Sequence, residues 1–150
     1  MCSIFFRYKL LYVLLLFLLF SRDSFSIVIK PKFQVIAFYT GKNDQAHISY
    51  VSEALKCLPK IAEENNFGFT ATNDWSNLNA EFLAGYQVVL FLDTRPDKPE
   101  QREAFQKYME SGGAWMGFHF SAFALSPSAY PQNWDWYHEE FSARHRSETS

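Results

Sequence analysis

The hydrophobic pattern along the chain alternates between short apolar runs and longer amphipathic segments. Four runs have the length of a buried strand, near residues 34–39, 68–72, 87–92 and 114–119. The run at 87–92 is apolar at nearly every position, as expected for a strand that helices cover on both faces of its sheet. Strands that alternate with helices pair in parallel through right-handed crossovers. We therefore predict an α/β fold, a flavodoxin-like doubly wound parallel sheet with strand order 2-1-3-4.

The segments between these runs read as helices with recognisable ends. Residues 47–66 have apolar positions at helical spacing, and Pro59 inside them should kink or split the helix. A short helix is expected around 78–83. Asp97 can cap the next helix, which Gly112-Gly113 should end. Residues 121–133 read as a loop, and an aromatic helical segment follows at 134–138.

The first 26 residues have the layout of a secretory signal peptide. Arg7 and Lys9 precede an apolar run at 10–20, and Ser24-Phe25-Ser26 offers a small-x-small cleavage site. The run is shorter than the roughly 20 apolar residues of a spanning helix. We predict export, to the periplasm or the extracellular space, with cleavage after Ser26. Because residues 4–6 are also apolar, an uncleaved anchor that holds the domain at the membrane is the alternative.

Cleavage would leave about 124 residues, enough for one domain with a real core. We assign this domain to 27–141, and the polar, aperiodic residues 142–150 read as a disordered tail. Of 14 basic and 16 acidic side chains, the leader contains three and one, so the mature net charge is near −4. That charge does not favour nucleic acid or an anionic membrane as a partner. Cys57 remains alone, which excludes an intramolecular disulfide.

His119 is the strongest candidate for chemistry. It ends the run 114–119 at the point where the pattern becomes loop, and Gly117-Phe118-His119-Phe120-Ser121 has the strand-to-turn placement of a nucleophile elbow. In an open α/β sheet, ligands bind beyond the carboxyl ends of the strands. An imidazole there can act as a general base, a proton donor or a metal ligand. The alternative is a hydrogen-bonded structural histidine beneath the aromatic loop.

Other polar candidates follow the remaining strands. His47 comes after the first strand, Asp74 after the second, and Thr94 and Arg95 after the third. For His47 and Asp74 the competing interpretation is a helix start or a turn. Two histidines and several carboxylates at one edge of the sheet could bind a divalent metal. The sequence identifies no particular cofactor. Motifs for nucleotide cofactors and for the familiar zinc proteases are absent from the sequence.

Three aromatic side chains near the end of the domain could contact a sugar. Trp134, Trp136 and Tyr137 are close in sequence, and aromatic rings stack on the apolar face of a sugar ring. The competing interpretation is a hydrophobic plug over the sheet edge. The sequence leaves both open.

Three stretches resemble the trehalose-utilisation family of ThuA-like domains. They are Ala84-Gly85-Tyr86-Gln87-Val88-Val89-Leu90-Phe91-Leu92, residues 100–108 and Gly112-Gly113-Ala114-Trp115-Met116-Gly117-Phe118-His119, and Trp134-Asp135-Trp136-Tyr137 fits the family's tryptophan-rich segment. The resemblance covers about 32–141. It implies a class I glutamine amidotransferase-like fold and a role in the metabolism of disaccharides and their keto derivatives, with a small-molecule carbohydrate as partner.

The resemblance also bears on the site. Amidotransferases have cysteine at the elbow, where ThuA-like proteins have the histidine that His119 matches, so amidotransferase chemistry is not expected. His47 matches a histidine that the family tends to carry after its first strand. The first turn departs from the family's frequent Thr-Gly-Gly and reads Thr40-Gly41-Lys42. Residues 142–150 match nothing in the family, and the chain reads as C-terminally truncated.

Three functional hypotheses follow. The first is an exported ThuA-like protein that modifies a carbohydrate with His119 as acid, base or metal ligand. The second is a sugar-binding module without catalysis. The third is a truncated, inactive remnant of a longer ThuA-like protein. Oligomeric state, substrate and reaction are not readable from the sequence.

Overall fold

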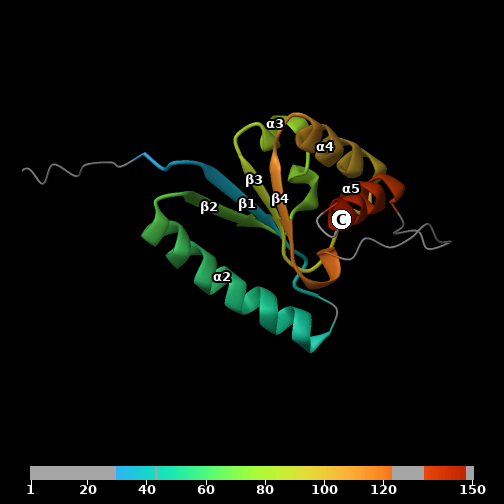
Figure 1. Ribbon diagram of the computed structural model, residues 1–150. Coiled ribbons are helices and arrows are strands. Elements are labelled where there is room, and N and C mark those ends of the chain that lie inside the picture. Colours follow the sequence, from blue (N-terminus) through green and yellow to red (C-terminus); the bar gives the residue numbers. More distant parts are fainter. Residues whose placement is uncertain (1–29, 43, 123–133, 148–150) are drawn as a thin grey trace, which may run out of the picture.

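One parallel sheet organises the computed structural model, which describes residues 30–42, 44–122 and 134–147 (Figure 1). Its strands are β1 (Gln34–Phe38), β2 (Gly68–Thr72), β3 (Val88–Phe91) and β4 (Ala114–Gly117). They lie in the order β2-β1-β3-β4, and each neighbouring pair is parallel. The predicted strand positions, strand order and α/β class are confirmed.

Helices cover both faces of the sheet. The helix α2 (Gln45–Asn65) lies on one face, and α3 (Ala80–Leu83), α4 (Pro99–Glu110) and α5 (Asp135–Ser147) lie on the other (Figure 1). Two short 3-10 helices, η1 (Trp75–Asn77) and η2 (His119–Ala122), follow β2 and β4. These turns start at the carboxyl ends of their strands, where a site is expected in this fold.

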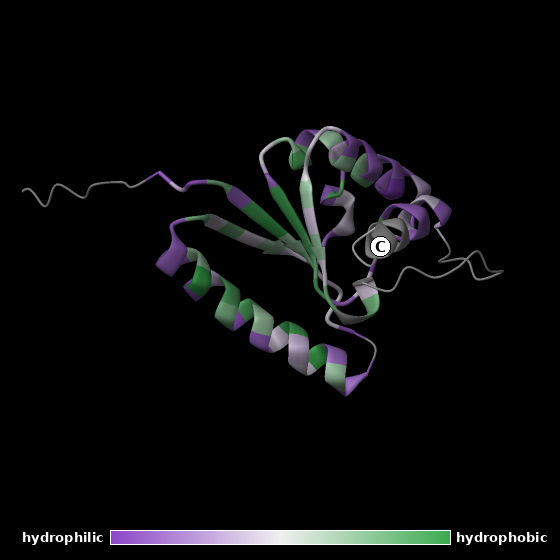
Figure 2. Cartoon of the chain, in the orientation of Figure 1, coloured by the Kyte–Doolittle hydropathy of each residue, from purple (hydrophilic) through white to green (hydrophobic). Residues whose placement is uncertain are grey.

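The strand residues divide the core into two layers. Val35, Ala37, Leu90 and Leu92 pack with Val51 on the α2 side. Alternate residues face the other way, because successive side chains of a strand point to opposite faces. This second layer is the larger and more aromatic one: Ile36, Phe38, Leu78, Leu83, Val89, Phe91, Phe105 and Tyr137. Figure 2 shows the most apolar strands, β1 and β3, in the middle of the sheet, and α4 as a mostly polar helix over one face.

Pro59 does not split α2. The helix continues as one element through Pro59, which is exposed. A proline removes one helical hydrogen bond and costs about 3 kcal/mol within a helix. The buried residues Val51 and Ala62 lie on either side of it, so both halves of the helix are held by packing. Asp44 caps the start by accepting a hydrogen bond from the His47 backbone N–H at 3.0 Å.

The start of α4 differs by one residue from the prediction. Lys98, rather than Asp97, is the N-cap, and Pro99 occupies the first turn. The backbone N–H of Lys98 donates to Oε1 of Gln101 at 3.4 Å, so a side chain within the helix closes this end. The double glycine ends α4 as predicted, and Gly112 has a φ of 90° that favours glycine.

The final helix is longer than the sequence predicts. It spans Asp135–Ser147, so the backbone of 142–147 is helical where we expected disorder. Residues 148–150, the predicted leader and most of the predicted loop at 121–133 lie outside the described residues.

None of the helices within 30–42, 44–122 and 134–147 is both long enough and apolar enough to cross a membrane.

Candidate functional site

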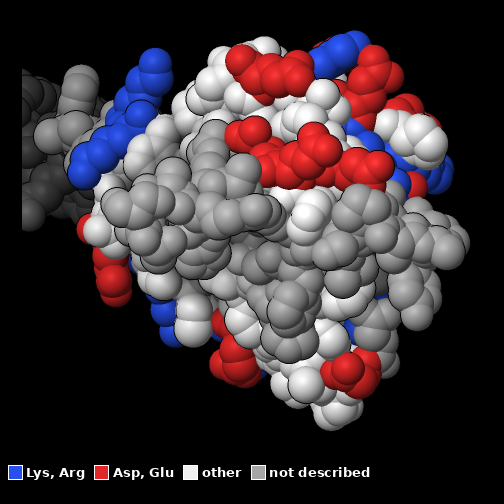
Figure 3. All heavy atoms as spheres, turned by 45° about the vertical axis from the view of Figure 1, so that its right-hand side comes forward, with Lys and Arg blue, Asp and Glu red and all other residues white. Residues whose placement is uncertain are grey.

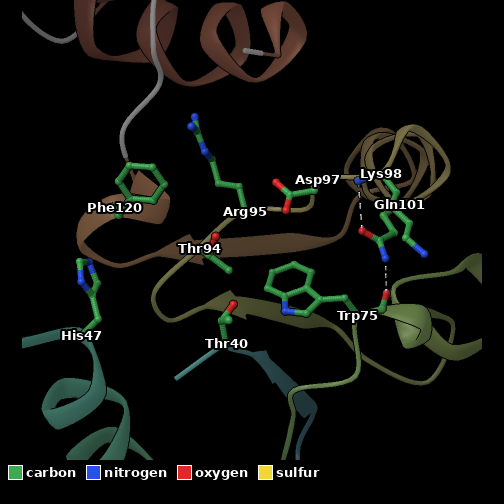
Figure 4. Close-up of a pocket in the computed structure, with 9 residues that line it drawn as sticks. All are labelled: Thr40, His47, Trp75, Thr94, Arg95, Asp97, Lys98, Gln101 and Phe120. Atoms are coloured by element: carbon green, nitrogen blue, oxygen red, sulfur yellow. Dashed lines mark hydrogen bonds between the residues drawn. The ribbon is translucent and has the colours of Figure 1, made fainter. Parts of the chain in front are cut away.

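A cavity of about 540 Å³ lies at the carboxyl edge of the sheet (Figure 4). Its volume falls in the range of roughly 300–1,000 Å³ that small-molecule sites occupy. The lining residues come from the segments after all four strands and from the starts of α2 and α4: Thr40, His47, Trp75, Thr94, Arg95, Asp97, Lys98, Gln101 and Phe120.

The topology explains why these residues meet. Thr40 follows β1, Trp75 follows β2, Thr94 follows β3 and Phe120 follows β4. Parallel strands end at the same edge of a sheet, so residues distant in sequence converge there. The structure thus has a hollow at the edge where we expected a site.

The predicted site residues fall into three groups. His47, Thr94 and Arg95 line the cavity. Asp74 is not among the lining residues; it caps η1 by accepting hydrogen bonds from the backbone N–H and the hydroxyl of Ser76 at 2.9 and 2.6 Å. His119 begins η2 immediately before the lining residue Phe120, and its side chain lies outside the described part of the structure.

The predicted sugar-stacking cluster belongs to the core instead of the cavity lining. Tyr137 is fully buried. Trp134 and Trp136 are half-buried and pack against the same core cluster. The rings of Trp134 and Tyr137 stack with centroids 5.0 Å apart. This arrangement fits the hydrophobic plug better than a free stacking surface.

His47 is oriented by the residue that caps its helix. Its Nδ1 lies 3.0 Å from Oδ2 of Asp44. The hydrogen bond from the His47 backbone, together with the imidazole, holds the pKa of Asp44 below its ordinary value. Asp44 therefore stays ionised at neutral pH and can orient the ring.

Arg95 links the cavity to α5. The residue is only 6% exposed, and its guanidinium carbon lies 5.4 Å from the ring centroid of Phe120 and 5.7 Å from that of Tyr137. Burial lowers the pKa of Arg95, but a guanidinium remains protonated in proteins. The cavity wall therefore contains a permanent positive charge.

A hydrogen-bond network holds the turn that carries His119. The Ser121 hydroxyl is buried, accepts from the Phe118 N–H at 2.8 Å and lies 2.7 Å from the carbonyl oxygen of Phe91. The Tyr137 hydroxyl donates to the Ser121 carbonyl at 2.5 Å. Burial raises the pKa of Tyr137, which keeps this hydroxyl a donor. Tyr137 thus positions the turn from within the core.

Among the lining residues that the sequence did not single out are Trp75 and Gln101. Trp75 follows the second strand within η1, and Gln101 lies in the first turn of α4. Trp75 carried a usable signal, because it comes directly after the candidate Asp74 at the same edge. Gln101 carried none, since a polar residue in the first turn of a helix is ordinarily solvated.

Within the described residues, no group of three or more His, Cys, Asp or Glu side chains is placed to hold a metal ion.

Comparison with known proteins identifies the family. The ThuA family, described as Trehalose utilisation, matches residues 35–149. The match thus continues through 142–149, so the expectation that this stretch matches nothing in the family is wrong. A crystal structure titled as a ThuA-like protein from Bacteroides uniformis ATCC 8492 superposes with a TM-score of 0.64 and is 31% identical. The match covers 72% of this chain and 42% of that one, so the chain spans less than half of the solved relative. No curated protein matches the sequence. The family match over most of the chain, and a solved relative with the same fold, show that the chain belongs to the ThuA, or trehalose-utilisation, family.

Proposed function

We propose that the protein binds and modifies a carbohydrate, a disaccharide or a keto sugar, in the cavity at the carboxyl edge of the sheet. The observation that carries the proposal is the convergence of four strand ends on one hollow, with His47 in its lining and His119 next in sequence to the lining residue Phe120. The family name, Trehalose utilisation, supports a sugar as the ligand.

In this proposal, His119 and His47 carry the chemistry. Imidazole is the side chain that gains and loses a proton near neutral pH, so it suits proton transfer to and from sugar hydroxyl or keto groups. Either ring could also bind a divalent metal. Thr94 and Arg95 supply a hydroxyl and a fixed positive charge for the polar groups of the ligand. The elbow position holds His119 instead of the cysteine of an amidotransferase.

A sugar-binding module without catalysis is the second candidate. It requires only the cavity and its polar lining, and it does not depend on proton transfer by His47 or His119. The two candidates predict the same binding, and only the first predicts a product.

Replacing His119 with alanine is expected to abolish binding of trehalose and to change the free energy of unfolding by less than about 1 kcal/mol, because the proposal places its imidazole outside any core network. Binding is measured by calorimetry with and without added Zn²⁺ or Mg²⁺, using trehalose, maltose and a keto disaccharide as probes. Stability is measured by urea unfolding. His138→Ala on α5 is the matched control, since His138 is not a lining residue, and it should keep full binding.

The opposite outcome would assign His119 a structural role. A buried partner left without its hydrogen bond costs about 1–3 kcal/mol. A stability loss of that size, with binding retained by the folded fraction, would contradict the functional assignment.

We further propose that the protein is exported and that small molecules, rather than nucleic acid, are its partners. The segment 10–20 supports export, and the acidic side chains that gather on the face in Figure 3 do not favour a polyanion. N-terminal sequencing of protein recovered outside the cytoplasm should give Ile27 as the first residue. An intact, membrane-bound chain would favour the anchor instead.

A further inference from the structure

Trp75 forms an aromatic wall of the cavity and is held from two sides. Its indole N–H donates to the carbonyl oxygen of Tyr39 at 3.1 Å. Its ring packs against Phe38 and Phe91, with centroid distances of 5.3 and 5.4 Å. The ring is therefore fixed before any ligand enters.

Gln101 fixes the backbone of the same residue. This side chain is only 6% exposed, and its Nε2 donates to the carbonyl oxygen of Trp75 at 2.9 Å. Its Oε1 accepts from the backbone N–H of Lys98 at 3.4 Å. Both Trp75 and Lys98 line the cavity, so Gln101 couples two parts of its wall. Such preorganisation lowers the entropy cost of binding.

Polar groups surround this aromatic wall. Figure 4 shows the hydroxyls of Thr40 and Thr94 and the carboxylate of Asp97 around the Trp75 ring. Hydroxyls both donate and accept hydrogen bonds, and a carboxylate accepts them. A pyranose has the complementary shape, with an apolar C–H face and a rim of hydroxyls. One rigid aromatic face with a mixed polar rim is therefore suited to a neutral sugar ring.

We propose that Trp75 is the stacking platform for a pyranose unit and a specificity-determining residue of the site, positioned by Gln101. The inference rests on the proposed function and deepens it. Trp134, Trp136 and Tyr137, the stacking residues expected from the sequence, are engaged in the core, whereas Trp75 lines the hollow. The competing explanation is that the Trp75 side chain only fills space between η1 and the sheet, since it also packs against the core cluster.

Indole resonances separate these explanations directly. The chain has four tryptophans, so protein labelled with ¹⁵N at tryptophan gives a spectrum in which Trp75→Phe identifies the Trp75 signal by its loss. On titration with trehalose or maltose, the Trp75 indole signal should shift the most. Trp75→Phe keeps an aromatic face and should bind within about threefold of wild type. Trp75→Leu removes the aromatic face and should raise the dissociation constant roughly tenfold, which corresponds to about 1.4 kcal/mol of binding free energy.

The control is Phe82→Leu, which exchanges another half-buried aromatic residue that is not among the cavity-lining residues. It should bind as wild type does. If wild type binds a probe and His119→Ala does not, while Trp75→Leu binds normally and the Trp75 signal stays in place, the proposed function survives and this inference is wrong. If wild type binds none of the probes, both fail. Binding is counted per folded molecule, so a stability loss in Trp75→Leu does not imitate a binding defect.

Discussion

Replacing Phe105 with alanine is expected to lower the free energy of unfolding by about 3–5 kcal/mol, the range for loss of a fully buried aromatic ring. Phe105 has no exposed surface and lies in the middle of α4. Its ring centroid is 4.8 Å from that of Phe91 on β3 and 6.3 Å from that of Trp115 on β4. The ring of Trp134, just before α5, and those of Trp136 and Tyr137 on α5 also lie against it. Alanine would therefore leave a cavity at the point where α4, α5 and the sheet pack together.

Urea unfolding measures this change through the midpoint, provided that the slope with denaturant stays constant. Ile61→Ala on α2 is the control, because Ile61 is 44% exposed and should cost at most about 0.5 kcal/mol. The free energy of unfolding of a small domain is only about 5–15 kcal/mol, so the loss expected for Phe105→Ala is a large part of it. Phe105→Leu is a milder variant that should stay folded. A loss below about 1.5 kcal/mol in Phe105→Ala would contradict the packing of α5 on α4.

The fold was predictable because its signal is local. Each strand is a continuous apolar run, and the residues that end the helices, such as Gly112, act through their own backbone geometry. The alternation of strands and helices then leaves few topologies, since crossovers are right-handed. Strand order followed from this restriction together with the flavodoxin-like pattern.

Local rules for helix breaks and ends were right only in part, because distant contacts compete with them. Pro59 was predicted to kink or split its helix, and α2 continues through it as one element, so the split does not occur. Asp97 is the better capping residue by type. The bonds that Gln101 makes to Lys98 and Trp75 nevertheless place the start of α4 one residue later.

The sequence predicted the location of the cavity but only some of the residues that line it. Strand ends fix which edge a residue reaches, and His47, Thr94 and Arg95 do line the cavity at that edge. Composition cannot separate an aromatic ring in the core from one at a surface. Trp134 and Trp75 are equally apolar, and their different surroundings depend on contacts with residues far away in the sequence.

The hydrogen bonds of Asp93 are the clearest example of contacts between distant residues that a local sequence pattern does not predict. Its two carboxylate oxygens accept from the backbone N–H groups of Thr40 and Gly41, each at 2.7 Å, across more than fifty residues of sequence. Asp93 is fully buried and follows β3, whereas Thr40 and Gly41 form the turn after β1. The Asp93 side chain thus fixes the part of the cavity wall that Thr40 forms. Gly41 takes a φ of 62° in the same turn.

Asp93→Asn is therefore expected to lower the free energy of unfolding by about 2–4 kcal/mol. The amide keeps one accepting oxygen and points its NH₂ group at a backbone N–H, which leaves a buried donor without an acceptor and removes charge-assisted bonds. The change should also move the pKa of Tyr50. Burial and, second, the charge of Asp93 raise that pKa, so removal of the charge should lower it toward its ordinary value. Urea unfolding measures the first effect, and ultraviolet titration of tyrosine measures the second.

Asp97→Asn is the matched control, because Asp97 is an exposed carboxylate at the same edge and its neutralisation should change stability by at most about 0.5 kcal/mol. If Asp93 holds the cavity wall as the structure indicates, the folded fraction of Asp93→Asn should also bind sugar probes more weakly than wild type, since Thr40 loses its fixed position. Wild-type stability in Asp93→Asn would contradict the bonds to Thr40 and Gly41. Reduced stability with an unchanged Tyr50 pKa would instead show that the Asp93 charge lies farther from Tyr50 than the structure places it.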